Sequence, residues 1–232
     1  MKTIVPPVFN YAITQSPGPL PNCTSQPPSS RYNLPMSMNP NFPLPFAETA
    51  RRPLNPEECA LVVIDIQEKL LPPIHEGARM VSNSQLLIRL AGILSLPVIV
   101  TTQYAKGLGG TVPQIAELLP DVTPLDKLEF GCFGNSAFCS AVEHLGGRNT
   151  LLLCGMETHI CVLQTALGAL GQGRIVHVAA DAIGSRTELN WKIGLKRMRD
   201  AGVVMSSTEM MIYELLGKSG TAAFKEMLKF IK

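Results

Sequence analysis

The sequence predicts an α/β protein with a doubly wound, Rossmann-like, mostly parallel sheet and helices on both faces. Two observations lead to this fold class. Short apolar runs rich in valine, isoleucine and leucine are typical of strands that are buried on both sides. Between these runs lie segments whose apolar residues recur with helical spacing, and the two kinds of segment alternate through most of the chain.

The first elements of this fold are expected between residues 59 and 120. Residues 59–66, CALVVIDI, form a continuous apolar run rich in β-branched residues, which predicts the first strand. In residues 82–96 the leucines and isoleucines fall on one helical face, which predicts a helix. The run at 96–103 predicts a second strand, and residues 112–120 predict a short helix.

The alternation continues through the middle of the chain. Residues 123–130 predict a third, less regular strand, and residues 135–147 predict a helix with a polar start and a glycine stop. Residues 149–155 predict a strand and residues 158–173 a helix that ends at glycine. The next apolar run, residues 174–183, predicts another strand of the same sheet.

The C-terminal part completes the sheet. Thr187 opens the predicted helix 187–202, and residues 203–207 predict the last strand. Two helices are expected to close the chain, the second at 221–232. In doubly wound sheets ligands bind beyond the carboxyl ends of the strands, so candidate site residues are sought there.

Residues 1–56 are expected to form an N-terminal arm, and residues 57–232 the folded domain. The arm contains 13 of the 19 prolines, which disfavour regular structure. We expect it to run extended over a packed surface of its own domain or of a neighbouring subunit; a disordered tail is the alternative. Its apolar anchors would be Val5, Val8, Phe9, Tyr11, Leu34, Phe42, Leu44 and Phe46.

Charge, apolar runs and cysteine spacing indicate which binding partners and which cellular compartment to expect. The net charge is +2 and no block of like charges occurs, which gives no reason to expect a nucleic acid or an anionic membrane as partner. No apolar run reaches the ~18 residues that span a bilayer, and prolines interrupt any secretory signal at the N-terminus. Six cysteines at irregular spacing are expected to be reduced thiols of a cytoplasmic protein.

Three residues at predicted strand ends could meet at one edge of the sheet: Asp65, Lys127 and Cys161. Each alone also has an ordinary structural interpretation: Asp65 as a turn former, Lys127 as a solvated charge and Cys161 as a core residue. Cys161 lies near the start of a predicted helix, where backbone N–H groups and the helix dipole favour a thiolate. We therefore expect its pKa to be lowered.

Three segments, LVVIDIQ, PLDKLEFGCF and GMETHICVLQTA, together resemble the isochorismatase-like cysteine hydrolases over roughly residues 58 to 216. This resemblance implies a catalytic triad of Asp65, Lys127 and Cys161. It also implies an oxyanion hole formed by the backbone N–H groups of Glu157 and Cys161, and a cis peptide bond between Met156 and Glu157. The segments expected near the pocket contain Leu70, Gln103 and Phe133.

Two departures from relatives in that family refine the expectation. Isochorismatase itself lacks the nucleophilic thiol, so Cys161 favours amide or related acyl chemistry. Nicotinamidases have histidine metal ligands near the second strand, whereas residues 98–110 contain no histidine, so we expect neither a metal nor a cofactor. His159 is expected to pack or hydrogen-bond locally, and Gly107–Gly110 to form a flexible loop near the site.

The leading hypothesis is a metal-independent cysteine hydrolase that cleaves a small amide or related acyl compound through a thioester. The resemblance further implies a homo-oligomer, a dimer or a tetramer. Two alternatives from other classes remain: a non-catalytic or weakly catalytic binding or scaffold protein with the same fold, and a thiol redox protein that uses Cys161 with Cys154 or Cys132 as a spatial neighbour.

Overall fold

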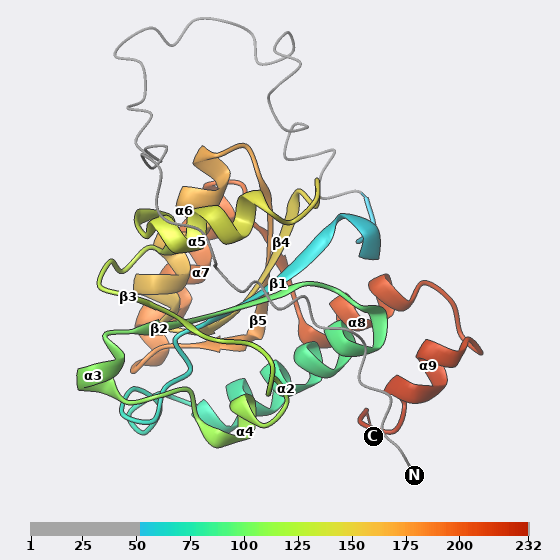
Figure 1. The fold of residues 1–232 in the computed structure, drawn as a ribbon, viewed down its shortest axis with the longest axis horizontal. Helices are drawn as coiled ribbons and strands as arrows, with labels where there is room; N and C mark the ends of the chain where they lie inside the picture. The colour runs from blue at the N-terminus through green and yellow to red at the C-terminus, as the bar shows by residue number, and fades with distance from the viewer. Residues whose placement is uncertain (1–51, 232) are drawn as a thin grey trace, which may run out of the picture.

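The computed structural model describes residues 52–231, which form one six-stranded sheet with helices on both faces (Figure 1). All neighbouring strands are parallel, in the order β3-β2-β1-β4-β5-β6, which confirms the predicted doubly wound class. The strands are β1 (Cys59–Ile64), β2 (Val98–Gln103), β3 (Leu125–Lys127), β4 (Thr150–Met156), β5 (Ile175–Gly184) and β6 (Val204–Ser206). The predicted arm lies, except for its last five residues, outside the described residues.

Helices connect successive strands, as parallel pairing requires, and the last two helices follow β6. The helices are α2 (Gly77–Leu94), α3 (Ala105–Leu108), α4 (Pro113–Ala116), α5 (Ser136–Glu143), α6 (Leu163–Gly171), α7 (Glu188–Asp200), α8 (Thr208–Leu216) and α9 (Ala222–Met227). Short helical turns are η1 (Pro56–Glu58), η2 (Cys132–Gly134) and η3 (Thr158–Val162), the last of which is π-helical and runs directly into α6.

Two local predictions need correction, the start of one helix and the conformation of one glycine-rich segment. Helix α2 begins at Gly77, five residues before the expected start, in a segment without a clear helical apolar pattern. The stretch Gly107–Gly110, expected to be a flexible loop, instead overlaps α3 and is tied down: Gln67 Nε2 donates to the Gly109 carbonyl at 2.8 Å, and Lys69 Nζ donates to the Gly107 carbonyl at 2.9 Å.

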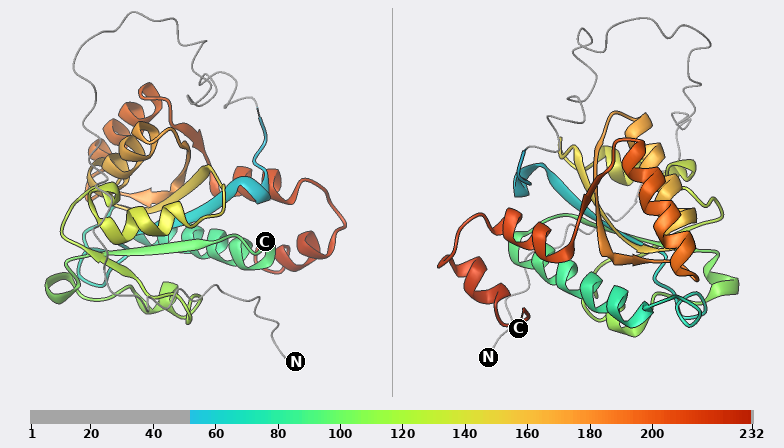
Figure 2. Two further views of the ribbon diagram at one scale, coloured as in Figure 1. Left: turned by 45° about the horizontal axis from the view of Figure 1, so that its top comes forward. Right: turned by 180° about the vertical axis from the view of Figure 1, so that it is seen from behind.

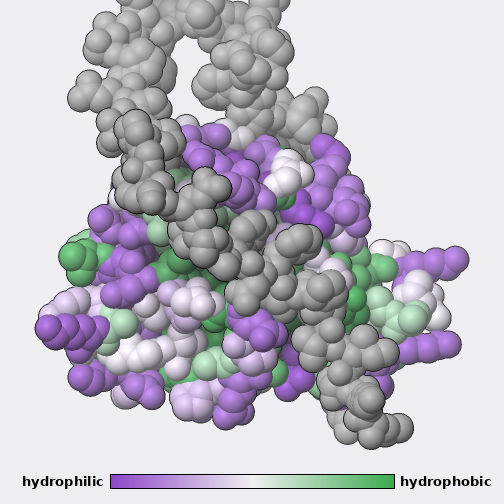
Figure 3. Space-filling model, viewed as in Figure 1, coloured by the Kyte–Doolittle hydropathy of each residue, from purple (hydrophilic) through white to green (hydrophobic). Residues whose placement is uncertain are grey.

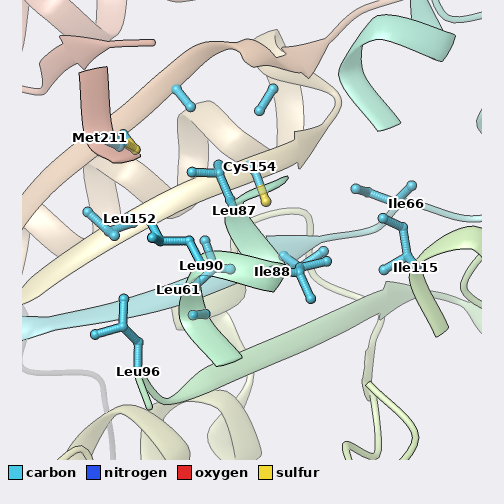
Figure 4. Close-up of a cluster of buried hydrophobic side chains, with 14 of the residues drawn as sticks. Leu61, Ile66, Leu87, Ile88, Leu90, Leu96, Ile115, Leu152, Cys154 and Met211 are labelled. Atoms are coloured by element: carbon cyan, nitrogen blue, oxygen red, sulfur yellow. The ribbon is translucent and has the colours of Figure 1, made fainter. Parts of the chain in front are cut away.

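Each face of the sheet has its own hydrophobic core. Figures 1 and 2 show the helices on both faces of the sheet. Along β1, Leu61 and Val63 face one core while Val62 and Ile64 face the other, which is the alternation of a strand buried on both sides. Helices α2, α4, α8 and α9 cover the first face, and α5, α6 and α7 cover the second. Figure 4 shows the first core, where α2 packs on β1 and β4.

The chain winds in opposite directions from β1 and β4, so these neighbouring central strands form the switch point at which ligands bind in such sheets. Gly155 allows the two strands to pair up to their carboxyl ends. It has φ +118°, and an added Cβ would lie 2.0 Å from the Ile64 carbonyl oxygen. Asp65 follows β1 and the turn with Cys161 follows β4, so both lie at this crevice.

A helix that crosses a membrane must be both long and apolar. Within residues 52–231 no helix combines the length and the apolar character needed to cross a bilayer.

Candidate functional site

Asp65 is held rigidly at the carboxyl end of β1. Its backbone turns sharply there with φ 51°, and its N–H donates to the Thr101 carbonyl on β2 at 3.1 Å. The side chain is fully buried. One carboxylate oxygen accepts a hydrogen bond from the Thr101 hydroxyl at 2.7 Å, and the other accepts from Lys127 Nζ at 2.7 Å. A buried carboxylate is tolerated because both of its oxygens have strong donors.

Lys127 brings its ammonium to this carboxylate from β3, at the end of the sheet, and only 2% of the residue is exposed. Its Nζ donates to Asp65 Oδ2 at 2.7 Å, Gln103 Oε1 at 2.8 Å, and the carbonyls of Glu129 at 3.2 Å and Phe130 at 3.4 Å. Burial alone would lower the pKa of Lys127, but the charge of Asp65 and its hydrogen bond outweigh burial, so the pKa is raised. The side chain is therefore an ammonium at neutral pH.

Two buried glutamines brace the ion pair. Gln103 ends β2 and accepts from Lys127, and its own side-chain amide donates to the Leu128 carbonyl at 2.8 Å. Gln67, two residues after Asp65, accepts from the Gln103 N–H at 2.7 Å and donates to the Gln103 carbonyl at 3.0 Å. Gln103 was expected near the pocket; Gln67 was not, although a polar residue directly after an apolar strand is a visible signal.

Cys161 lies in η3, the helical turn that follows β4, and is 6% exposed. Burial raises the pKa of its thiol well above the usual value. The negative charge of Asp65 and a hydrogen bond with that carboxylate raise the pKa further, and the Lys127 ammonium offsets only part of this effect. The three predicted site residues are thus neighbours in the structure.

The prediction that the pKa of Cys161 is lowered is wrong. It rested on the position of the thiol near the start of a helix, where backbone N–H groups favour a thiolate. In the structure Cys161 is the fourth residue of η3, and desolvation together with the adjacent carboxylate outweighs the helix. The resting sulfur is therefore a thiol beside the Asp65 carboxylate.

The turn between β4 and η3 is fixed by Glu157. The Met156–Glu157 peptide bond is cis, as the resemblance predicts. The Glu157 carbonyl accepts from the N–H groups of Ile160 and Val162 at 3.0 and 3.2 Å. Its buried carboxylate accepts from the Arg186 backbone N–H at 3.0 Å and from Arg186 Nε at 3.1 Å. This pair joins the turn to the loop after β5, and sequence reasoning missed it because the partners are 29 residues apart.

His159, two residues before the thiol, makes a local hydrogen bond, as expected: its Nδ1 lies 3.0 Å from the Ser185 hydroxyl. Within residues 52–231 no group of three or more histidine, cysteine, aspartate or glutamate side chains is placed to hold a metal ion. The residues of the site are an ion pair and a thiol, and they do not present a ligand set for zinc.

Two residues expected near the pocket have apolar side chains that pack against the cores, and the Leu70 N–H donates to the Gln67 carbonyl at 3.2 Å. Leu70 is half-buried and packs against the core on the α2 face. Phe133 is half-buried on the opposite face, where its ring meets Phe138 edge-on with centroids 5.1 Å apart. Their contribution to substrate binding stays a prediction.

A second thiol, Cys132, approaches the same cluster from η2. Its sulfur is 4.0 Å from the Thr101 hydroxyl, and its N–H donates to the Thr165 hydroxyl at 3.0 Å. It is fully buried, and burial raises its pKa to about 11. Cys132 and Cys161 belong to the same hydrophobic core on this face of the sheet.

Comparisons with known proteins agree with this architecture. The family model described as "Isochorismatase domain" matches residues 59–210. A relative from Phytophthora sojae, named secreted isochorismatase effector Isc1, is 36% identical over 182 residues, which cover 77% of this chain and 87% of that protein.

Solved structures resemble the chain over a similar span. A Caenorhabditis elegans structure titled MAR1 ribonuclease has a TM-score of 0.72 and 38% identity, covering 78% of this chain and 92% of the other. The Escherichia coli YcaC product, titled an octameric hydrolase of unknown specificity, has a TM-score of 0.72 and 27% identity over 77% of this chain and 90% of the other. Since the family model and these relatives span most of the sheet and the site, the chain belongs to the isochorismatase family of hydrolases.

Proposed function

We propose that this protein is a metal-independent cysteine hydrolase that cleaves a small amide or related acyl compound through a thioester on Cys161. The observation that supports this most strongly is the position of the Asp65 carboxylate, which contacts the Cys161 thiol on one side and the Lys127 ammonium on the other. A thiol, a base and a cation that orients the base are the parts of an activated nucleophile.

In the first half-reaction, Asp65 takes the proton of the Cys161 thiol as the sulfur attacks the substrate carbonyl carbon. The raised pKa of the thiol makes this proton transfer part of the attack, because little thiolate exists beforehand. The carbonyl oxygen becomes an oxyanion, for which the backbone N–H groups of Glu157 and Cys161 are the proposed donors. The C–N bond then breaks, and Asp65 returns the proton to the leaving amine.

In the second half-reaction, water attacks the thioester carbonyl. Asp65 accepts a proton from this water, the C–S bond breaks, and the proton returns to the Cys161 sulfur while the acid product leaves. Lys127 keeps its ammonium throughout, pairs with Asp65 while that side chain is a carboxylate, and balances the charge that develops on sulfur. No metal takes part in these steps.

We further propose that the protein is a homo-oligomer. Nine large hydrophobic side chains of the described domain are at least 37% exposed, including Leu128 at 70% and Leu189 at 67%, and a subunit interface would cover side chains of this kind. Hydrophobic residues are also visible among hydrophilic ones on the face drawn in Figure 3. The octameric E. coli relative supports the same proposal.

The experiment is a hydrolysis screen of the full-length protein against small amides, carbamoyl compounds and esters, with Cys161→Ala and Cys132→Ala as variants. Cys132→Ala is the matched control, because it removes a second buried thiol of the same cluster. We expect Cys161→Ala to lose hydrolysis by about 10³-fold or more and Cys132→Ala to retain most of it. Full activity of Cys161→Ala would overturn the proposal.

Two further arms of the screen separate the alternatives. RNA is included as a substrate because the C. elegans relative is titled a ribonuclease. If wild type and Cys161→Ala cleave RNA equally well, that cleavage does not pass through a thioester on Cys161. A binding or scaffold protein would turn over no compound of any class. A redox protein would lose thiols on peroxide treatment in wild type more readily than in Cys161→Ser.

A further inference from the structure

We propose that Gly194, on α7, is a positioning residue for the nucleophile. Its missing side chain lets α7 pack directly on the backbone of the turn that carries Cys161, and this contact keeps the thiol against Asp65. The inference rests on the proposed role of Cys161. Gly194 does not touch the reacting groups and acts through the residues that precede the thiol.

The contact between α7 and η3 is unusually close at this glycine. Gly194 is a buried residue in the interior of α7. A Cβ added there would lie 3.0 Å from Thr158 Cγ2 and 3.2 Å from both the Cα and the backbone N of His159. Two of these three neighbours are backbone atoms, which cannot move aside as a flexible side chain can. An alanine at 194 would therefore require a shift of η3 by a few tenths of an ångström.

Helix propensity makes this glycine costly, which favours a packing reason for it. Glycine in a helix interior is about 1 kcal/mol less favourable than alanine. Gly92, in the last turn of α2, offers the comparison, since a Cβ there would meet nothing within 4 Å. A glycine-to-alanine substitution therefore makes no close contact at Gly92 in α2, whereas at Gly194 in α7 it collides with the turn that carries Cys161.

The turn has little freedom to absorb such a shift without moving Cys161. Its first residue, Thr158, is fully buried, and the Glu157 carboxylate anchors the preceding residue to Arg186. A push on His159 is therefore transmitted along the helical turn to the thiol two residues later. Misplacement of a reacting group by about 1 Å can cost on the order of 10²-fold in rate, and a smaller shift costs proportionately less.

The experiment compares Gly194→Ala with Gly92→Ala in the full-length protein. We expect Gly194→Ala to lower kcat by about tenfold with little change in KM, because the substrate site is kept while attack is misaligned. The pH midpoint for iodoacetamide labelling of Cys161, followed by mass spectrometry, should move down towards the ordinary thiol value of about 8.5 as the contact with Asp65 loosens. Gly92→Ala should match wild type in both measurements.

A second variant keeps the test informative if Gly194→Ala is poorly folded. Thr158→Ser removes Cγ2, the nearest of the three colliding atoms, so the double variant should recover part of the lost kcat and of the labelling shift. Wild-type kcat and labelling in well-folded Gly194→Ala would overturn the inference. If no substrate is hydrolysed by any variant but the labelling shift is present, the positioning role stands and the proposed hydrolase function fails.

Discussion

Asp65 is the residue on which the proposed chemistry of the site depends. One of its oxygens is bound by Thr101 and the other by Lys127, and the thiol of Cys161 reaches the same carboxylate. A buried ion pair contributes little net stability in general, so we propose that its role here is to hold the carboxylate next to the sulfur as a base.

The Asp65→Asn variant tests two effects of this carboxylate: it raises the pKa of the Cys161 thiol, and it is the proposed base for hydrolysis. The carboxylate raises the pKa of the Cys161 thiol by its charge and its hydrogen bond, and Lys127 lowers it. Removal of the negative charge takes away both of the effects by which the carboxylate raises this pKa, so we expect the pH midpoint of iodoacetamide labelling at Cys161 to fall. Hydrolysis should be lost in the same variant by about 10³-fold, because no base remains to accept the proton.

Labelling rates followed by mass spectrometry from pH 6 to 11 check this, because a lower thiol pKa gives faster labelling at each pH, and Asp126→Asn is the control. Asp126 is the residue before Lys127 but is bound to Thr102 and the Ala105 N–H, away from the thiol. An unchanged or raised midpoint in Asp65→Asn would show that the carboxylate does not act on Cys161.

The sequence was enough to predict that the three candidate site residues lie close together, but not which of them are protonated. Strand ends and the three motifs were enough to select Asp65, Lys127 and Cys161, because parallel topology brings such positions to one edge. The pKa of Cys161 was predicted with the wrong sign, since desolvation depends on packing that no local pattern shows. Thr101 and Gln67 were missed for the same reason: their hydrogen-bond partners lie 36 residues away along the chain.

Among the elements, the pairing of β1 with β4 is the one that assembles the site. Gly155→Ala would place a Cβ 2.0 Å from the Ile64 carbonyl oxygen at a φ of +118°. We expect a melting temperature lower by on the order of 10 °C, or no folded protein, because the strands must separate where Asp65 emerges.

Gly147→Ala is the matched control for this prediction, measured by the same thermal unfolding. Gly147 also has a positive φ, +86°, but a Cβ there would meet nothing within 4 Å. It therefore carries the conformational cost without the collision. Equal effects of the two substitutions would mean that the strand contact at Gly155 adds nothing to stability.

Strand β5 contains a buried histidine that couples stability to pH. Burial lowers the pKa of His177 to about 4 from an ordinary 6.5. Above pH ~6.5 the ring is neutral in both states and contributes nothing. As the pH falls below 6.5 the unfolded chain binds a proton that the native ring does not, so the free energy of unfolding should drop by about 2 kcal/mol between pH 7.5 and pH 5 from this group.

Denaturant unfolding at the two pH values checks this, with His177→Gln as the comparison. The variant removes the titrating group, so its loss of stability between pH 7.5 and pH 5 should be smaller than that of wild type by about the same 2 kcal/mol. An identical pH dependence in the two proteins would contradict the assignment to His177.

Element types were largely predictable, because continuous β-branched runs and helical apolar spacing are strong signals. The exceptions are short or weakly patterned. The start of α2 at Gly77 lacks an apolar stripe, and α3 has only four residues, two of them in the stretch expected to be a loop. The helical segment after β4 was expected as one helix, whereas its first turn, η3, is π-helical.

For the whole molecule, the order of the strands follows from topology rules rather than from any single residue. Alternating strands and helices with right-handed crossovers leave few arrangements, and the doubly wound one puts ligands at the β1–β4 crevice. What the sequence does not determine is whether the exposed apolar residues are covered, because the proposed oligomer contacts depend on surface geometry that no local pattern shows. The expected cytoplasmic location likewise stays a prediction, and the P. sojae relative is named a secreted effector.

Deletion of residues 1–50 tests the role predicted for the arm. The described chain begins just before Leu54, which is buried in the core and donates its N–H to Glu214 of α8 at 3.1 Å. If the preceding segment also packs on the domain or on a neighbour, the deletion should lower the melting temperature or the mass measured by light scattering. Unchanged values of both would favour the disordered tail.

The central claim is that Cys161 forms a covalent acyl intermediate, and rapid quenching followed by intact-protein and peptide mass spectrometry tests it most directly. Wild-type protein is mixed with a substrate from the screen, quenched in acid at short times and compared with Cys161→Ala. We predict a transient mass increase equal to the acyl group, located on the peptide that contains Cys161, and none in the variant. Product formation without any adduct at Cys161, at an equal rate in Cys161→Ala, would contradict the claim.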